Sequence, residues 1–222
     1  MDFKCPYCDA LNSFPSSAAG LTRQCMNCIE AFIVPSHGEQ IAKKVLLPIE
    51  TEKFRLRRFE PEDWEALLEF QCEDEGEATS WLHQVSQVRF GEVRRPFELA
   101  IALRDSGKVI GSAGLMFTDP ALNQMEISLS LNQTATPKGL AVEVLEAILD
   151  FCFQELNLHR VIAECNSNEI DTRRLYEQVG MRKEAEFVKQ YFVNGEWLST
   201  TWYAILEEEY FTETPAGDEK SS

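Results

Sequence analysis

Four cysteines in two pairs near the N-terminus constrain the fold of this chain more than any other feature. Cys5 and Cys8 form the first pair, Cys25 and Cys28 form the second, and sixteen residues separate the pairs. Two residues between thiolates make a tight turn that lets both sulfurs reach one ion, and the second pair completes a tetrahedron. The spacing therefore predicts a Zn²⁺ site with four thiolate ligands. Because no coordination position stays open for water or substrate, this zinc would be structural and not catalytic.

Two other roles for the cysteines, a pair of disulfides and a redox-active dithiol, fit the sequence less well. Disulfides persist in oxidising compartments, and no charged-then-apolar signal segment precedes Cys5. A redox C-x-x-C normally follows the first strand of a βαβ unit, which the short polar stretch at residues 11–13 does not provide. We therefore expect a cytoplasmic protein in which residues 1–35 form a small zinc ribbon.

The net charge of −16 falls on the part of the chain that follows the predicted ribbon. In residues 1–48 the acidic and basic side chains cancel one another, so the whole deficit belongs to residues 49–222. Such a field repels phosphate backbones and attracts cations, which argues against nucleic acid as a partner and favours a basic amine. Solubility alone would explain the acidity equally well. The apolar runs are shorter than the roughly 20 residues of a membrane span, so we expect no membrane insertion.

A cluster of polar and helix-breaking residues at 35–40 separates the ribbon from the rest of the chain. The end of the chain is polar as well, and it contains Pro215 and Gly217. We therefore predict a linker at 36–48, an independently folding domain at 49–211 and a disordered tail at 212–222.

The predicted domain alternates between strand-like and helix-like patterns. The clearest helix begins near residue 140, where apolar residues recur with helical period up to Phe151, and it ends near Asn157. Asn194-Gly195 is a strong hairpin-turn signal. The other expected elements are strands at 54–59, 99–103, 109–110, 126–131 and 160–163, a helix opening at Pro61, and a helix at 171–179 that stops at Gly180. This order predicts an α+β fold with one central mixed sheet flanked by helices.

Six segments in this order resemble the GNAT superfamily of N-acetyltransferases, in particular the branch that acetylates the N-termini of ribosomal proteins. The segments are TEKFRLRRFEPEDW, GKVIGSAGL, MEISLSL, GLAVEVLEAILDFCFQELNLHRVIAECNSNE, TRRLYEQVGM and NGEW, and the resemblance covers residues 49–210. It implies direct transfer of an acetyl group from acetyl-CoA to a primary amine, either a protein N-terminus or a small amine.

The resemblance also implies where acetyl-CoA binds. In the family the cofactor lies where two adjacent parallel strands splay apart, and its pyrophosphate rests on amides at the start of the long helix, where the helix dipole favours an anion. The family writes this loop as Gln/Arg-x-x-Gly-x-Gly/Ala, whereas residues 134–139 read TATPKG, so only Gly139 is kept and Pro137 removes one donor amide. The implied cofactor-binding residues are Leu129, Leu131, Thr136, Lys138, Gly139, Leu140, Ala141 and Asn168. An ordinary helix start, with Thr136 as N-cap and Pro137 as the first helical residue, would need no ligand.

Two residues match catalytic positions of the family. Tyr176, within LYEQVG, matches a tyrosine that protonates the departing CoA thiolate, although a helical tyrosine is more often part of a core. Glu126 matches a glutamate that deprotonates the incoming ammonium, although an exposed strand position explains it nearly as well. Asp171 stands where the family has serine, and a helix N-cap would account for it.

The sequence leaves two further functions open. The chain could be a degenerate acetyltransferase fold that serves only as a binding module, with the ribbon contacting a protein partner. Alternatively, the ribbon could deliver an active enzyme to a ribosome, although Lys4 and Arg23 are the only basic residues in its loops.

Overall fold

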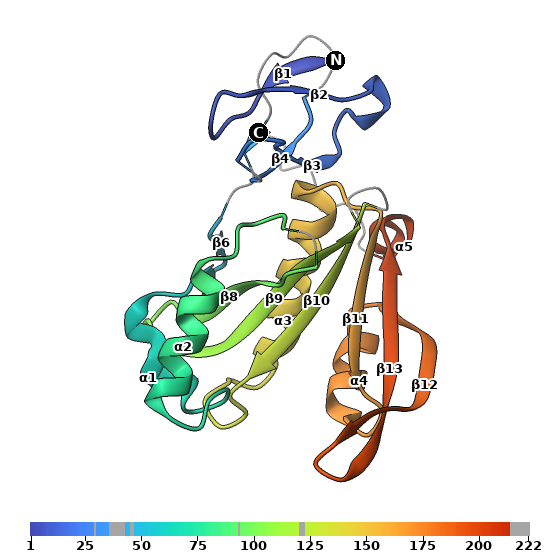
Figure 1. Cartoon of the computed structure of the whole chain (residues 1–222). Coiled ribbons are helices and arrows are strands. Elements are labelled where there is room, and N and C mark those ends of the chain that lie inside the picture. The colour runs from blue at the N-terminus through green and yellow to red at the C-terminus, as the bar shows by residue number, and fades with distance from the viewer. Residues whose placement is uncertain (29, 36–42, 45–46, 93, 120–122, 214–222) are drawn as a thin grey trace, which may run out of the picture.

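The computed structural model describes residues 1–28, 30–35, 43–44, 47–92, 94–119 and 123–213. Within these ranges a small N-terminal module of short strands lies at one end of an eight-stranded sheet that carries helices on both faces (Figure 1). The predicted α+β class with a central mixed sheet is confirmed. No helix among the described residues is long and apolar enough to cross a membrane.

The N-terminal module consists of two small sheets around an aromatic cluster. Phe3 packs edge to face on Phe32, with ring centroids 5.4 Å apart, and stacks on Phe14. So small a core is too little to hold a chain together without a further link such as a metal. The elements are β1 (Asp2–Lys4) and β2 (Leu11–Ser13), the turn η1 (Ser16–Ala18), and the second sheet of β3 (Thr22–Gln24), β4 (Ala31–Ile33) and β5 (Lys43–Lys44). Because β5 pairs with β4, the predicted linker is wrong at residues 43–44, and residues 36–42 and 45–46 lie outside the described part.

The large sheet has the strand order β12-β13-β11-β10-β9-β8-β7-β6. Every neighbouring pair described is antiparallel except β10 and β11. The strands are β6 (Ile49–Glu50), β7 (Phe54–Arg58), β8 (Phe97–Leu103), β9 (Val109–Asp119), β10 (Gln124–Leu131), β11 (Arg160–Asn166), β12 (Arg182–Val193) and β13 (Glu196–Leu206). The β12–β13 hairpin turns at Asn194-Gly195, as predicted, because both residues adopt the left-handed conformation that this turn requires.

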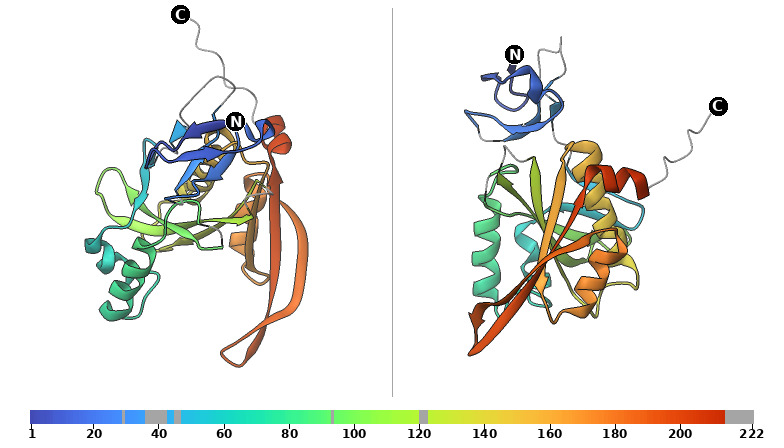
Figure 2. Two further views of the ribbon diagram at one scale, coloured as in Figure 1. Left: turned by 45° about the horizontal axis from the view of Figure 1, so that its top comes forward. Right: turned by 90° about the vertical axis from the view of Figure 1, so that its right-hand side faces the viewer.

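Helices cover the two faces of the sheet (Figure 2, right). On one side lie η2 (Pro61–Asp63), α1 (Trp64–Leu67) and α2 (Glu75–Ser86); on the other lie α3 (Leu140–Asp150), its π-helical extension η3 (Phe151–Glu155) and α4 (Ile170–Gln178), and α5 (Glu207–Glu213) follows β13. The main apolar core lies between the sheet and α3.

Two helices were not predicted from the sequence. Helix α2 is absent from the predicted elements because its apolar stripe is weak: only Ala78 and Leu82 are buried. Helix α5 extends through Glu213, so the predicted disordered tail is wrong for residues 212 and 213, and residues 214–222 lie outside the described part.

Candidate functional site

The centre of the large sheet contains a gap between its only described parallel strands. β10 and β11 pair over Gln124–Ile127 and Arg160–Ala163, and the pairing stops there although both strands continue. Beyond this point β10 still pairs with β9 as far as Leu131, and β11 still pairs with β13 as far as Asn166. The two strands therefore diverge (Figure 1). On the β11 side, the backbone groups of residues 128–131 have no strand partner among the described residues, which is the arrangement that accepts an extended ligand rich in amide groups.

Asn132 organises the loop that leads from β10 to α3. Its side chain is 5% exposed, and its Oδ1 accepts hydrogen bonds from the amides of Thr134 (3.0 Å) and Ala135 (3.2 Å). Its Nδ2 donates to Glu69 Oε2 at 2.7 Å, which ties the loop to the segment after α1. This residue was not predicted from the sequence. The available signal was an Asn directly after a strand, because Asn readily bonds to backbone amides two and three residues ahead.

Helix α3 begins at residue 140, where its apolar periodicity predicts it. Leu140 is its first residue, and Gly139 holds the N-cap position with φ +85°, a left-handed conformation that suits glycine. The alternative start, with Thr136 as N-cap and Pro137 as first helical residue, is therefore wrong, because the Thr136 hydroxyl instead donates to the carbonyl of Asn132 at 2.7 Å. The amide of Leu140 donates to the carbonyl of Pro137 at 3.1 Å. The remaining amides, of Lys138, Gly139 and Ala141, have no acceptor among the described residues, and Lys138 and Gly139 are exposed.

Tyr176 of α4 lies buried beside the gap. It is 2% exposed, and its ring centroid lies 5.5 Å from that of Tyr203. Its hydroxyl has no hydrogen-bond partner among the described residues. Burial raises the pKa of Tyr176 well above its ordinary value, and Cys165, Glu169 and Glu126 raise it further. The phenol therefore keeps its proton at neutral pH.

Glu126 of β10 points to the opposite face of the sheet from the main core. Its neighbours Met125 and Ile127 are buried in that core, whereas Glu126 is half-buried. Burial raises the pKa of Glu126, and the nearby carboxylate of Glu164 raises it further. Glu126 has no ion-pair partner in the described part of the chain. The charge of Glu126 is also one of the causes that raise the pKa of Tyr176.

Glu98 of β8 is a candidate that was not predicted from the sequence. The strand register aligns Glu98 with Gly114 and Gly114 with Ser128, so these residues share the face that carries Glu126. A Cβ at Gly114 would lie 2.8 Å from Glu98 Oε1 and 2.4 Å from Ser128 Oγ, so the absent side chain leaves the space that Glu98 uses. Burial raises the pKa of Glu98 to about 7. The available signal was a lone acid within the apolar run of β8.

The turn between β11 and α4 carries Asn168. Asn168 is exposed, and its carbonyl accepts the amide of Ile170 at 3.0 Å. The interpretation of Asp171 as helix N-cap is wrong: Glu169 is the N-cap, and Asp171 lies inside the first turn. The difference arises because α4 begins at Ile170, one residue before the predicted start.

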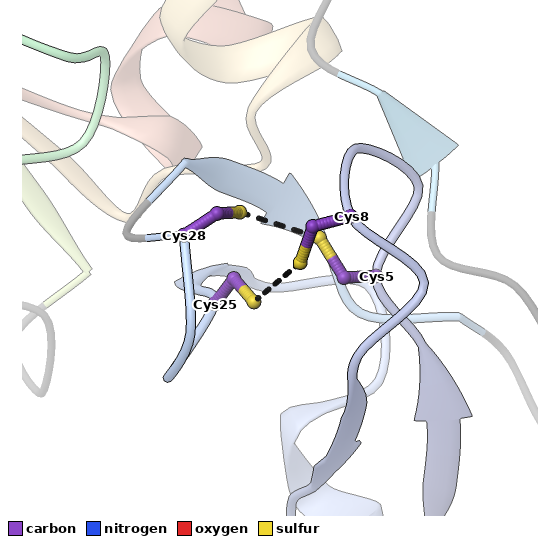
Figure 3. Close-up of side chains that lie close together, drawn as sticks. All are labelled: Cys5, Cys8, Cys25 and Cys28. Atoms are coloured by element: carbon purple, nitrogen blue, oxygen red, sulfur yellow. Dashed lines mark hydrogen bonds between the residues drawn. The ribbon is translucent and has the colours of Figure 1, made fainter.

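The four paired cysteines converge, as Figure 3 shows. Their Sγ atoms all lie within 4.8 Å of one another, with 3.7 Å between Cys5 and Cys28 and 3.7 Å between Cys8 and Cys25. A tetrahedral Zn²⁺ with bonds of about 2.3 Å would hold its sulfurs about 3.8 Å apart, so the spacing fits this ion. All four thiols are free, which excludes the disulfide alternative in this structure.

Nitrogen donors surround the cysteine sulfurs. The amide of Tyr7 donates to Cys5 Sγ at 3.4 Å, and the amide of Asn27 and the side chain of Asn12 donate to Cys25 Sγ at 3.4 Å and 3.5 Å. Burial alone would raise the pKa of Cys25, but these donors and the Cys28 amide outweigh it and lower that pKa to about 6. Such donors stabilise thiolates, the form that binds a metal.

Comparisons with known proteins agree with this geometry. The family described as "Acetyltransferase (GNAT) domain" matches residues 53–182. The uncharacterized N-acetyltransferase YnaD of Bacillus subtilis is 31% identical over 73% of this chain and 98% of its own length. A spermidine N(1)-acetyltransferase of Vibrio cholerae is 30% identical over 33% of this chain and 42% of its own. The crystal structure of a GNAT-family acetyltransferase from Bacillus anthracis superposes with a TM-score of 0.64 at 26% identity, covering 73% of this chain and 99% of that one. The chain belongs to the GNAT acetyltransferase family.

Proposed function

We propose that this protein is an N-acetyltransferase that moves an acetyl group from acetyl-CoA directly to a primary amine. The observation that carries the proposal is the gap between β10 and β11, where the parallel pairing ends at Ile127 while both strands continue. The unpaired backbone of residues 128–131, including that of Leu129 and Leu131, can pair with the amide groups of the pantetheine arm.

The start of α3 suits the pyrophosphate of acetyl-CoA. The unengaged amides of Lys138, Gly139 and Ala141 lie at the positive end of the helix dipole, and the exposed Lys138 ammonium adds a cation. Thr136 and Leu140 contribute through the shape of the loop, since their polar groups bond within it. Asn168 lies on the turn after β11 and so borders the same gap from the other strand.

Glu126 and Tyr176 supply the acid and base chemistry. Glu126, on the open face, accepts a proton from the incoming ammonium, so that the neutral amine attacks the thioester carbonyl. Tyr176, on the core face, keeps its proton until the C–S bond breaks and then donates it to the departing thiolate, and the second proton released by the attacking nitrogen restores the phenol. The raised pKa of Glu126 suits a base because it brings the carboxylate closer to the pH at which it must exchange protons.

The acceptor is an amine that arrives as a cation. Glu98, Glu126 and Glu164 share one face of the sheet beside the gap, and none has an ion-pair partner among the described residues. An ammonium is the complementary charge. A small amine, such as the spermidine named for the Vibrio cholerae relative, and a protein N-terminus, as in the ribosomal branch, both meet this requirement.

The N-terminal cysteines hold a structural Zn²⁺ in this proposal, because four sulfurs at tetrahedral spacing leave no position for substrate. Free thiols suit a reducing compartment such as the cytoplasm. The surface of this ribbon then provides the place for a protein partner.

Two measurements test the proposal. Calorimetric titration with acetyl-CoA, followed by a thiol-release assay with spermidine and with N-terminal peptides, should give binding and turnover. Binding without turnover on any amine would favour the degenerate binding module, and an absence of binding would contradict the cofactor site. Metal analysis of the purified chain should give one zinc per chain, and a value near zero would contradict the metal site.

A further inference from the structure

The N-terminal module makes polar contacts with the large domain in which backbone carbonyls accept the hydrogen bonds. Thr22 Oγ1, in a 3%-exposed residue of β3, donates to the carbonyl of Leu156 at 2.6 Å. Asn157 Nδ2 returns a bond to the carbonyl of Gly20 at 2.8 Å. These bonds join the module to the connection between η3 and β11. The Thr22 bond is buried and therefore costly to leave unmade, so the module is joined to the large domain by more than the connecting chain.

A second contact joins the module to the loop between α2 and β8. The amide of Ala31 in β4 donates to the carbonyl of Phe90 at 3.0 Å, and the Gln24 side chain donates to the carbonyl of Gly91. Arg89 Nη1 donates to the carbonyl of Cys28 at 2.5 Å, so the loop directly contacts a residue of the cysteine cluster.

This contact reaches the main apolar core. Ala31 is 2% exposed and belongs to the core cluster of the large domain, not to the aromatic cluster of the module. Phe90 packs edge to face on Phe97, Phe117 and Phe151, with ring centroids 5.3 to 6.1 Å apart. Gly91 approaches Ala31 so closely that a Cβ on Gly91 would lie 2.6 Å from Ala31 Cβ. The module therefore completes one end of the core.

The cysteine cluster controls the part of the module that makes these contacts. Cys25 directly follows β3, and Cys28 lies three residues before Ala31, so the second cysteine pair closes the β3–β4 hairpin. A metal would lock this hairpin, since it replaces weak contacts among thiols by four bonds. Figures 1 and 2 place the module at the end of the sheet where β10 begins, away from the gap between β10 and β11.

We propose that the cysteine module is a metal-dependent brace of the acetyltransferase core: an ion bound by the four cysteines holds β3 and β4 against Leu156 and Phe90, and so stabilises the large domain. The proposal rests on the metal site proposed above. It differs from the expectation drawn from the sequence, in which residues 49–211 fold independently of the ribbon.

Tryptophan fluorescence can follow the large domain without interference from the module. All four tryptophans, Trp64, Trp81, Trp197 and Trp202, lie outside residues 1–35. We would compare thermal melts of the full zinc-loaded chain with those of the chain after chelation. The tryptophan-monitored Tm should fall by about 5 °C on metal removal, and the Ala31 amide should exchange its hydrogen faster. An unchanged melt in a chain that has lost its metal would overturn the proposal.

Two glycine variants locate the coupling. Gly91→Ala would force Ala31 away. Gly107→Ala is the control: Gly107 also has a positive φ, +73° against +99° at Gly91, but a Cβ added to Gly107 would have no atom within 4 Å. Gly91→Ala should abolish most of the metal-dependent shift, and Gly107→Ala should keep it. If Gly91→Ala does not fold, Thr22→Val removes the bond to Leu156 and should reduce the shift. If metal removal lowers the Tm of the measured variant, Gly91→Ala or Thr22→Val, as much as it lowers the Tm of the wild-type chain, the proposed contact is wrong.

Metal content separates the two proposals. If the purified wild-type chain holds no metal, the metal site fails and the brace fails with it. If it holds one zinc and chelation leaves the melt unchanged, the metal site stands and the brace alone is wrong.

Discussion

On the face covered by α3 and α4 the sheet beside the gap is apolar and sealed, whereas on the face covered by α1 and α2 it is acidic and half open. Met125, Ile127 and Tyr176 belong to the first face and are almost fully buried. Glu98 and Glu126 belong to the second, and burial raises the pKa of both. A single strand, β10, supplies residues to both faces because its side chains alternate.

The difference between the faces separates the two proton transfers of the proposed reaction. An acid on the sealed face keeps its proton in the absence of water, and a base on the open face meets the ammonium as it arrives. In the proposed reaction the gap joins the two faces, and the charge of Glu126 is one of the causes that raise the pKa of Tyr176. Three substitutions test this division, from the largest expected effect to the smallest.

Tyr176→Phe should give the largest effect, because it removes the proposed acid from the sealed face. The change removes a hydroxyl that has no hydrogen-bond partner among the described residues, so stability should hold while turnover falls by about 10² to 10⁴. Tyr203→Phe is the matched control, since its hydroxyl donates to Glu177 at 2.9 Å. That variant should lose about 1 kcal/mol of stability and keep its turnover. Thermal melts and steady-state rates of both variants test this prediction. Equal turnover in the two variants would mean that another group, and not Tyr176, protonates the thiolate.

Glu98→Gln tests whether a buried acid on the open face makes the stability of the chain depend on pH. Burial favours the neutral form of Glu98 in the folded chain. It raises the pKa of Glu98 to about 7 from the ordinary value of 4.5. Between these values the folded state binds more protons than the unfolded state, so the free energy of unfolding falls as pH rises from about 4.5 to about 7. Glu98→Gln should flatten this slope and stabilise the chain at pH 8 by at most about 3 kcal/mol.

The control for Glu98 is Glu65→Gln, which removes the same charge from the exposed surface of α1. Chemical denaturation at several pH values measures the slope for each variant. The free energy of unfolding could keep its slope against pH in Glu98→Gln, or it could lose the same slope in Glu65→Gln. Either result would show that the pH dependence comes from overall charge and not from the buried Glu98.

Gly139→Ala should give the smallest effect, at the start of α3. Gly139 has φ +85°, and a Cβ added to it would have no atom within 4 Å, so the cost is backbone strain of about 1 kcal/mol and not a clash. Gly107→Ala carries the same kind of strain at a turn elsewhere in the chain. Both should lower the Tm by similar amounts, but only Gly139→Ala should weaken acetyl-CoA binding. Calorimetry on the two variants tests this, and equal affinities would mean that the loop amides do not bind the cofactor.

The sequence predicts the strands and the cysteine cluster well because both depend on local spacing. Period-two alternation marks β10, the Asn194-Gly195 turn marks the last hairpin, and two C-x2-C pairs mark the converging sulfurs. Prediction from the sequence fails where a contact between distant residues determines the local structure. The alternative start of α3, with Thr136 as N-cap, is wrong because the Thr136 hydroxyl donates to the carbonyl of Asn132, whose side chain in turn donates to Glu69. No local pattern contains that contact.

Glu98 and the brace could not be predicted from the sequence for the same reason. Glu98 is notable only because Gly114 on the neighbouring strand leaves space for it, and the pairing of β8 with β9 fixes which glycine that is. The contact between Ala31 and Phe90 joins residues from two regions whose compositions suggest separate domains. Both features come from strand register and tertiary contact, which spacing along the chain does not determine.

The gap has one more consequence, because it gives β10 a free edge inside a sheet instead of at its rim. Free edges usually invite strands from other proteins and promote aggregation. Over residues 128–131 that hazard is reduced by position: β9 occupies one side of β10, and β11 and β13 stand beyond the opening. An incoming strand at this edge would have to pair with β10 inside the sheet and not beside it, so the interior position protects an edge that would be exposed at the rim.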